Sequence, residues 1–239
     1  MPVGTTVATE LDPPALYRLL AWLSPGFPVG GYTYSHGIEY AVEVGLVADG
    51  RSLQGWISEI LCRGAGVVDA SLLAAAWRAV RDGDEEALLR VAERAAAWRS
   101  TAETALESEA QGTAFLAAVA AGWPDARRDA AVTPLAEAGI APAYAIAVAI
   151  AGGCASVAVD ALVRAYLQAF AASLVSAGVR LIPLGQSEGV RILSALEAAV
   201  ESAAVLARDR DLDELGTSAW MTEWASMRHE RQYTRLFRS

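Results

Sequence analysis

The sequence predicts an all-α protein, a single compact helical bundle of about eight to ten helices. The chain is rich in Ala, 54% hydrophobic and only 8% aromatic, a composition that favours helices packed through small side chains. Apolar residues recur at spacings of three and four, the period of an amphipathic helix. We find no strand-like alternation and no internal repeat, so residues 1–239 are expected to form one domain.

The first third of the chain predicts short helices separated by Gly and Pro. A helix is expected to start at Asp12-Pro13, an N-cap followed by Pro. The segment 24–31 contains two Pro and three Gly and predicts a constrained turn. A short helix should end at Gly45, and Ser52 should cap the next one. Glycines at 64–66 then indicate a break.

The rest of the chain predicts longer helices. One is expected from about Glu85 to Ala120, followed by an irregular stretch at 127–139. Residues 140–159 carry no charge over a length that could span a bilayer. Because Gly152-Gly153 interrupts this stretch and neither flank is basic, we expect two buried helices there. Further helices are expected at about 156–178 and 187–207, and an acidic linker at 209–214.

Composition excludes several functions. The net charge of −9 disfavours non-specific binding to nucleic acid, which is itself negatively charged. All nineteen basic residues are Arg, so a Walker A motif and a Schiff-base Lys are both absent. Cys62 and Cys154 lie in apolar surroundings, typical of small core residues in a reducing compartment. Residues 1–10 lack the pattern of a signal peptide, which predicts a cytoplasmic protein without a membrane anchor.

Three internal motifs were weighed as sites. His36, Glu39 and Glu43 have helical spacing and could share one face; a polar surface patch is the expected role. With two His and two separated Cys, one subunit cannot supply a nitrogen-rich metal site, so no metal ligand is assigned. Glu103 and Glu107 are expected on a solvated acidic face. Residues 179–189, V-R-L-I-P-L-G-Q-S-E-G, form either a shaped recognition loop or a simple helix connection.

The C-terminal segment, residues 221–239, is the most informative part of the chain. It combines arginines with aromatic side chains, the residue types enriched at protein–protein hot spots. The candidate partner-binding residues are Arg228, Arg231, Tyr233, Arg235 and Phe237. A final helix packed on its own core is the alternative interpretation.

Three blocks together resemble one family. They are F-P-V-G-G-Y-T-Y-S-H-G-I-E-Y-A-V-E-V-G-L-V at 27–47, V-R-L-I-P-L-G-Q at 179–186 and S-M-R-H-E-R-Q-Y-T-R-L-F-R-S at 226–239. In this order, and over nearly the whole length, they are similar to the UreF family of urease accessory proteins. The resemblance implies a homodimeric, non-enzymatic helical chaperone without a cofactor of its own.

The resemblance also implies partners. UreF-like proteins bridge the accessory protein UreD, called UreH in some organisms, and the GTPase UreG, and so take part in nickel delivery to apo-urease. It implies a UreG-facing set, Glu39, Asp69, Glu103 and Arg180, and a C-terminal segment ordered mainly by contact with UreD or UreH. His36 stands where some relatives have Gln, so a nickel role is not assigned to it.

Two other functions stay open at this point. One is a helical hydrolase or lyase that uses His36 and Glu39 as acid and base, although no nucleophile or second base accompanies them. The other is a helical scaffold unrelated to urease. The sequence also leaves open whether nickel passes through the protein, and whether GTP hydrolysis is stimulated or restrained.

Overall fold

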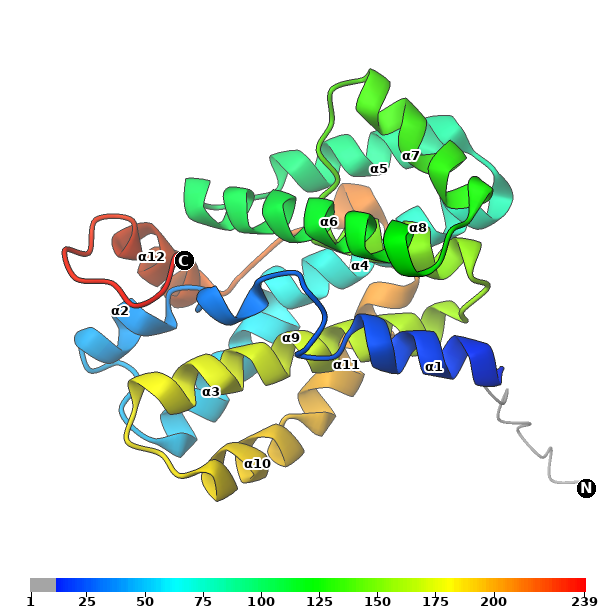
Figure 1. Cartoon of the computed structure of the whole chain (residues 1–239). Coiled ribbons are helices and arrows are strands. Elements are labelled where there is room, and N and C mark those ends of the chain that lie inside the picture. Colours follow the sequence, from blue (N-terminus) through cyan, green and yellow to red (C-terminus); the bar gives the residue numbers. More distant parts are fainter. Residues whose placement is uncertain (1–11) are drawn as a thin grey trace, which may run out of the picture.

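The computed structural model describes residues 12–239, and every regular element in that range is helical (Figure 1). The prediction of an all-α protein is therefore confirmed. The helices are α1 (Pro13–Trp22), η1 (Gly31–Thr33), α2 (Ile38–Glu43), α3 (Gly50–Arg63), α4 (Ala65–Asp82), α5 (Glu85–Ala97), α6 (Ala102–Gly122), α7 (Ala126–Glu137), α8 (Tyr144–Cys154), α9 (Val159–Leu181), α10 (Gln186–Ala195), α11 (Glu197–Arg208), η2 (Leu212–Glu214) and α12 (Trp220–His229).

Helix α8 lies at the centre of the core. It packs against α4, α6, α7 and α9, and all its residues after Tyr144 are buried. Gly112 of α6 allows the backbone at Pro142 to approach closely, since a Cβ on Gly112 would collide with the Pro142 carbonyl. The small side chains predicted from composition therefore serve close helix packing.

The described residues contain twelve α-helices, more than the expected eight to ten. Two expected helices are each divided in two, and one stretch expected to be irregular is helical. The expected helix from Glu85 to Ala120 is two helices, since the chain breaks between α5 and α6 at 98–101. The stretch 127–139, expected to be irregular, lies mostly in α7, which starts at an N-cap Asp125 and contains Pro134. The expected helix at 187–207 changes direction at Leu196, between α10 and α11.

Two local predictions were also wrong. Gly152 and Gly153 do not break a helix: they lie inside α8, where Leu162 and Val80 occupy the space of their missing Cβ atoms. Ser52 does not cap α3. Asp49 does, and Ser52 completes the capping box by accepting the Asp49 backbone amide.

The stretches Gly50–Asp82 and Val159–Leu181 are long and apolar enough to cross a bilayer by composition alone, but 72% and 50% of their apolar windows are buried in the protein. Helix α8, which lies within the uncharged stretch 140–159, has 11 residues and is buried after Tyr144. These features are typical of core helices.

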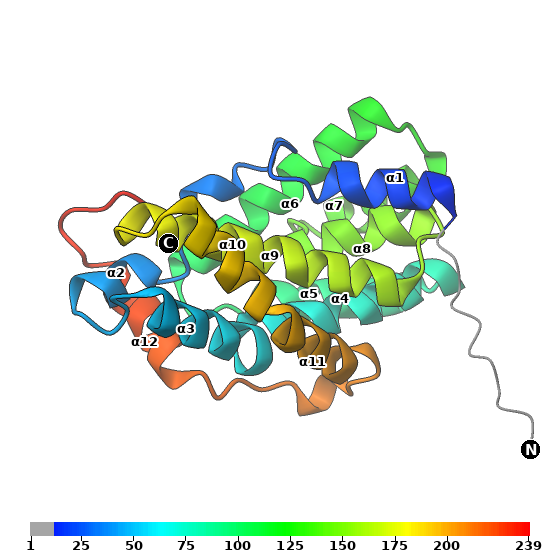
Figure 2. The same ribbon diagram turned by 90° about the horizontal axis from the view of Figure 1, so that it is seen from below.

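The end of the chain folds back onto the body of the molecule. Helix α12 packs against α2 and α3, and residues 230–239, called the tail below, loop beside α2 (Figures 1 and 2). The Ser35 amide donates to the Ser239 carbonyl over 2.9 Å, and the Arg238 amide donates to the Thr33 carbonyl over 2.8 Å. The tail therefore contacts the body of the molecule through the backbone of Arg238 and Ser239.

Candidate partner-binding site

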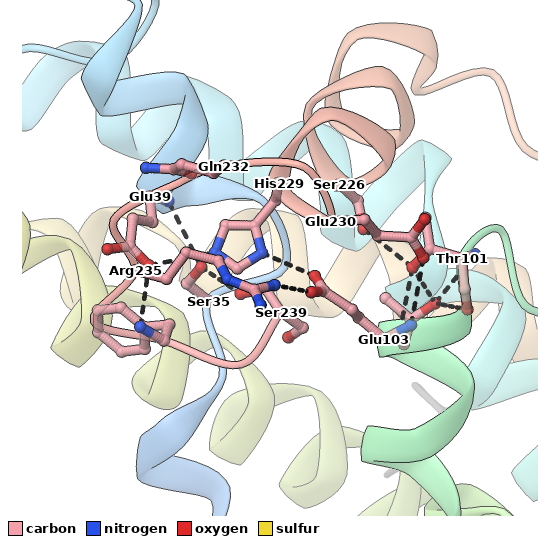
Figure 3. A network of polar contacts seen from close by, with 12 residues as sticks. Ser35, Glu39, Thr101, Glu103, Ser226, His229, Glu230, Gln232, Arg235 and Ser239 are labelled. Atoms are coloured by element: carbon pink, nitrogen blue, oxygen red, sulfur yellow. Dashed lines mark hydrogen bonds and ion pairs between the residues drawn. The ribbon is translucent and has the colours of Figure 1, made fainter.

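The tail is anchored by a carboxylate–histidine clamp made of Glu39, Glu103 and His229 (Figure 3). His229, at the end of α12, is fully buried. Its Nδ1 lies 2.7 Å from Oε2 of Glu103, and its Nε2 lies 3.1 Å from Oε2 of Glu39. One ring thus joins carboxylates from two helices, α2 and α6, that are far apart in the sequence.

Glu39 also binds the backbone of the tail. The amide of Leu236 donates to its Oε1 over 2.6 Å, and the amide of Phe237 donates to its Oε2 over 2.9 Å. Gly37 precedes α2 with a φ of 76°, and a Cβ there would lie 2.6 Å from the Ser226 amide nitrogen. Glycine is therefore required for α2 to approach α12 and for Glu39 to reach the tail.

Glu103 connects the clamp to the start of α6. Arg235 of the tail forms an ion pair with its carboxylate. Glu230 accepts hydrogen bonds from the free amides of α6, 2.8 Å from the Ala102 nitrogen and 3.4 Å from the Glu103 nitrogen. Carboxylates at a helix N-terminus satisfy amides that have no partner within the helix, and they interact favourably with the helix dipole.

A second histidine holds the end of the tail indirectly. His36 Nε2 lies 3.0 Å from Oε1 of Glu107, and Oε2 of Glu107 accepts from the Ser239 hydroxyl over 2.7 Å. Burial is the largest influence on His36 and favours its neutral form. The charge and hydrogen bond of Glu107 outweigh burial, so the pKa of His36 is raised.

Arg180 meets the tail on another side. Its guanidinium lies 4.4 Å from the centre of the Phe237 ring, a cation–π contact. The same side chain donates to the Tyr32 carbonyl over 2.7 Å. Phe237 is buried while Arg180 is exposed, so the ring has a cationic cover that a partner can reach.

Asp69 is the one UreG-facing candidate that does not touch the tail or clamp in the described structure. It forms an ion pair with Arg99, 3.0 Å from Oδ1 to Nη2, and accepts from the Tyr166 hydroxyl over 3.2 Å. Burial, and then the charge of Asp69, raises the pKa of Tyr166 well above its ordinary value. Clefts of ≈ 290 Å³ and ≈ 410 Å³ share Asp69, Arg99 and His36 in their walls.

The outer face of the C-terminal segment is exposed and partly apolar. Arg228 lies over the Tyr40 ring, which also contacts Trp224 edge to face. Arg231 is exposed, and Tyr233 is fully exposed. The exposed large apolar side chains of α12 and the tail are Trp220, Met221, Trp224, Met227, Tyr233 and Leu236. Such a group of aromatic, Met and Arg side chains is typical of a protein–protein interface.

The structure therefore joins the two candidate sets that the sequence treated as separate surfaces. Glu39 and Glu103 hold the tail, and Arg180 covers Phe237. Sequence reasoning missed the contact between Glu39 and His229. It also predicted a solvated position for Glu107, which is buried in the structure. The glutamates at 39, 103 and 107 were the only sign of this site in the sequence. Their partners could not be predicted, because they lie far away along the chain.

The described residues offer little support for a metal centre or an acid–base pair. Within residues 12–239 no group of three or more His, Cys, Asp or Glu side chains could hold a metal ion. His36 does not share a helix face with Glu39, since it precedes α2 with a φ of 50° and pairs with Glu107. Both Cys are free.

The fold and the site define the class of the protein: it is all-helical, with a C-terminal segment held by a buried histidine between two carboxylates. The UreF family model matches residues 47–197. Curated relatives named urease accessory protein UreF include one from Bradyrhizobium sp. (strain BTAi1), 47% identical over 100% of this chain and 98% of its own. Another, from Granulibacter bethesdensis, is 48% identical over 94% of each chain. The chain therefore belongs to the UreF family of urease accessory proteins.

Proposed function

We propose that the protein is a nickel-insertion chaperone that bridges UreD (or UreH) and the GTPase UreG during nickel delivery to apo-urease. The observation that carries this proposal is the contact of the tail with Glu39, Glu103 and Arg180. A partner that binds the tail acts at the same time on the residues assigned to UreG. One ordered segment thereby couples two partners.

The exposed side chains of α12 support UreD or UreH as the partner of this segment. Trp220 and Trp224 are exposed at 73% and 42%, although α12 packs against the core through its other face. Large exposed aromatic side chains in one segment supply hot-spot anchors. Arg228 and Arg231 add cationic donors at the same place.

We propose that UreG contacts a surface formed by Arg180 and the residues around the clamp. Glu39 is 7% exposed, so it acts chiefly by fixing the tail. Arg180 is exposed and available to an incoming acidic surface. Asp69 contributes through the clefts that it shares with His36.

Nickel is proposed to be cargo. Both nitrogens of His229 face carboxylates, and His36 is bonded to Glu107. Because both nitrogens of His229 are engaged and the chain has only two His and two separated Cys, the isolated protein should bind nickel weakly and without fixed stoichiometry. Catalysis by His36 and Glu39 is disfavoured, since each is paired with a different group.

A cytoplasmic homodimer completes the proposal. Leu16, Tyr17 and Leu20 on α1 are exposed at 44%, 68% and 67%, an apolar face that a second copy could cover. Isologous two-fold contacts are the commonest arrangement of homo-oligomers. The mass of the UreD complex measured by light scattering should correspond to two copies of the 25.1 kDa chain together with the bound UreD, and a single copy in that complex would contradict this.

The proposal is tested by pull-downs with UreD alone and with UreD plus UreG. Deleting residues 224–239 should abolish UreD binding and, with it, UreG recruitment. Arg180→Ala should weaken UreG recruitment while leaving UreD binding intact, because Arg180 covers Phe237 without anchoring the backbone of the tail. Arg127→Ala, an exposed change on α7, is the control. Full UreD binding by the truncated chain would refute the proposal.

A further inference from the structure

The larger of the two clefts, ≈ 410 Å³, lies apart from the C-terminal segment. Its lining comes from residues 23–36, from α6 and α9, and from Asp69, Arg99 and Tyr144, and no residue of 177–239 belongs to it. Its volume falls within the range of small-molecule sites, about 300–1,000 Å³. The cleft is therefore a candidate ligand site whose walls do not depend on the position of the tail.

Arg99, in the wall of this cleft, carries hydrogen-bond donors that no described group accepts. Its side chain is 8% exposed and forms the ion pair with Asp69. Nη1 lies 3.3 Å from Oδ2, and Nη2 lies 3.0 Å from Oδ1 without the alignment of a hydrogen bond. Within residues 12–239, Nε and Nη2 of Arg99 and Oδ1 of Asp69 have no hydrogen-bond partner. Because unpartnered buried polar groups are costly, these atoms indicate that the cleft receives a polar group.

The three atoms define the chemistry of that group. The N–H of Nε and one N–H of Nη2 form the side edge of the guanidinium and point in parallel, so they suit a single carbonyl oxygen. The carboxylate oxygen Oδ1 of Asp69 only accepts, so it requires a donor next to that carbonyl. A primary amide presents an acceptor and a donor side by side in one plane. A carboxylate would instead bring a second negative oxygen against Oδ1.

The charges in the wall of the cleft also favour a neutral ligand. Its acidic side chains are Asp69 and Glu107, and its basic side chains are Arg99 and His36. With His36 protonated these four charges cancel, and with His36 neutral they leave one negative charge. Neither state provides the surplus of positive charge that would attract an anion.

Much of the remaining wall is aromatic and already fixed in position. The constrained turn 24–31 forms one side of the cleft. Within it Phe27 packs on Phe115, with ring centres 5.4 Å apart. On another side Tyr144 contacts Tyr166, with ring centres 5.6 Å apart. A preformed aromatic wall beside a few convergent polar atoms is typical of a site that holds an apolar body by its polar end.

We propose that this cleft binds a neutral primary amide carried on an apolar body. The amide oxygen accepts from Arg99, and the amide nitrogen donates to Asp69. The source is either a free small molecule or the Asn or Gln side chain of a partner, which share this chemistry. The inference goes beyond the proposed function. Its main test uses the isolated full-length chain, so the amide site and the proposed partners can fail independently.

Benzamide and benzoate are matched probes, because they share a ring and differ in the charge and donors that would face Asp69. Binding of each to the isolated full-length chain is followed by NMR titration. We expect benzamide to bind saturably, and benzoate to bind at least about tenfold more weakly because a like charge opposes it. Absence of saturable benzamide binding up to its solubility limit, or equal affinity for the two probes, would overturn the proposal.

Two variants with the same substitution locate the site. Ser173 is exposed on α9 and lines the cleft, so Ser173→Trp should block benzamide. Ser202 is exposed on α11 and is not part of the lining, so Ser202→Trp should bind benzamide as the wild type does. Benzamide binding that survives Ser173→Trp would place the ligand elsewhere and overturn the proposal.

A third variant tests the role of Asp69 directly. In Asp69→Asn the preference should reverse, because benzoate then supplies the negative charge that Arg99 has lost. A folded Asp69→Asn protein that still prefers benzamide would contradict the assignment. If this variant does not fold, the wild type and the two Trp variants decide the matter.

The source of the amide is identified by competition, in an arm that rests on the proposed function. Saturating benzamide is added to the pull-down with UreD and UreG. Loss of a partner would show that the amide belongs to a partner side chain, and an undisturbed complex would show that it belongs to a free small molecule. Both results retain the amide site, which the binding experiments with the isolated chain test by themselves.

Discussion

Helix α8 and the tail are both fixed against the same core, yet they are held by opposite kinds of contact. Helix α8 is held by close packing of small apolar residues, ten of which are buried. The tail is held by Glu39, Glu103, His229 and Arg235, with Phe237 as its buried apolar anchor. Packing is insensitive to pH and salt, whereas a charged clamp depends on both. The contrast indicates that the core and the tail are stabilised by different kinds of contact.

The largest expected effect comes from the charged pair inside the core. Asp69→Ala should lower the free energy of unfolding by about 3–5 kcal/mol, because Arg99 would be left buried without its counter-charge. Urea unfolding followed by circular dichroism measures this. Asp82→Ala, at an exposed position outside this cluster, is the control. A loss no greater than in the control would show that the core tolerates an unpaired charge, which would weaken the contrast.

The stability of the protein should be nearly as sensitive to changes in the packing around α8. Gly112→Ala forces a methyl group onto the Pro142 carbonyl, and overpacking of this kind costs roughly 1–3 kcal/mol. Gly122→Ala in the same helix meets no atom within 4 Å and should be neutral or slightly stabilising. Thermal unfolding of the two variants gives the comparison. Equal melting temperatures would show that close approach at Gly112 is not required.

A substitution in the clamp should weaken docking of the tail without unfolding the core. Glu39→Gln removes the charge that faces His229, and hydrogen bonds to charged groups are worth about 1.5–3 kcal/mol. Docking of the tail should therefore weaken by roughly 10- to 100-fold, seen as faster tryptic cleavage after Arg231 and Arg235. Glu59→Gln, in an exposed pair with Arg63, is the control. If Glu39→Gln lowers global stability as much as Gly112→Ala does, the tail is part of the core.

The smallest effect concerns His36. Its raised pKa means that the His36–Glu107 pair contributes stability in full below the unfolded-state pKa of about 6.5. This contribution is lost as pH rises through the folded-state pKa. His36→Gln should therefore flatten the dependence of stability on pH above about pH 6.5. Denaturant titrations at several pH values test this, and an unchanged slope in the variant would contradict it.

Sequence reasoning captured what local patterns encode. Helical periodicity gave the fold class, and the glycines at 64–66 marked the boundary between α3 and α4. It failed where local signals were ambiguous. Nothing distinguishes Gly152 in close packing from Gly152 as a helix breaker. The break at 98–101 contains neither Gly nor Pro.

The site was predictable only in part. Arg180, Glu39 and the C-terminal segment were singled out, but not their mutual contacts. The partners Glu39 and His229 are 190 residues apart, and no periodicity encodes such a pairing. A buried histidine between carboxylates also has the same local sequence as an exposed one. The burial of Glu107 was missed for the same reason, since its partners His36 and Ser239 lie on other elements.

The most direct test of the central claim, that the tail docks on its own core through a clamp separable from that core, is amide hydrogen exchange in the isolated full-length chain. The amides of Leu236 and Phe237 should be protected in the wild type and lose that protection in Glu39→Ala, while the amides of α8 exchange equally slowly in both. Unprotected tail amides in the wild type, or an equal loss of protection in α8, would contradict the account.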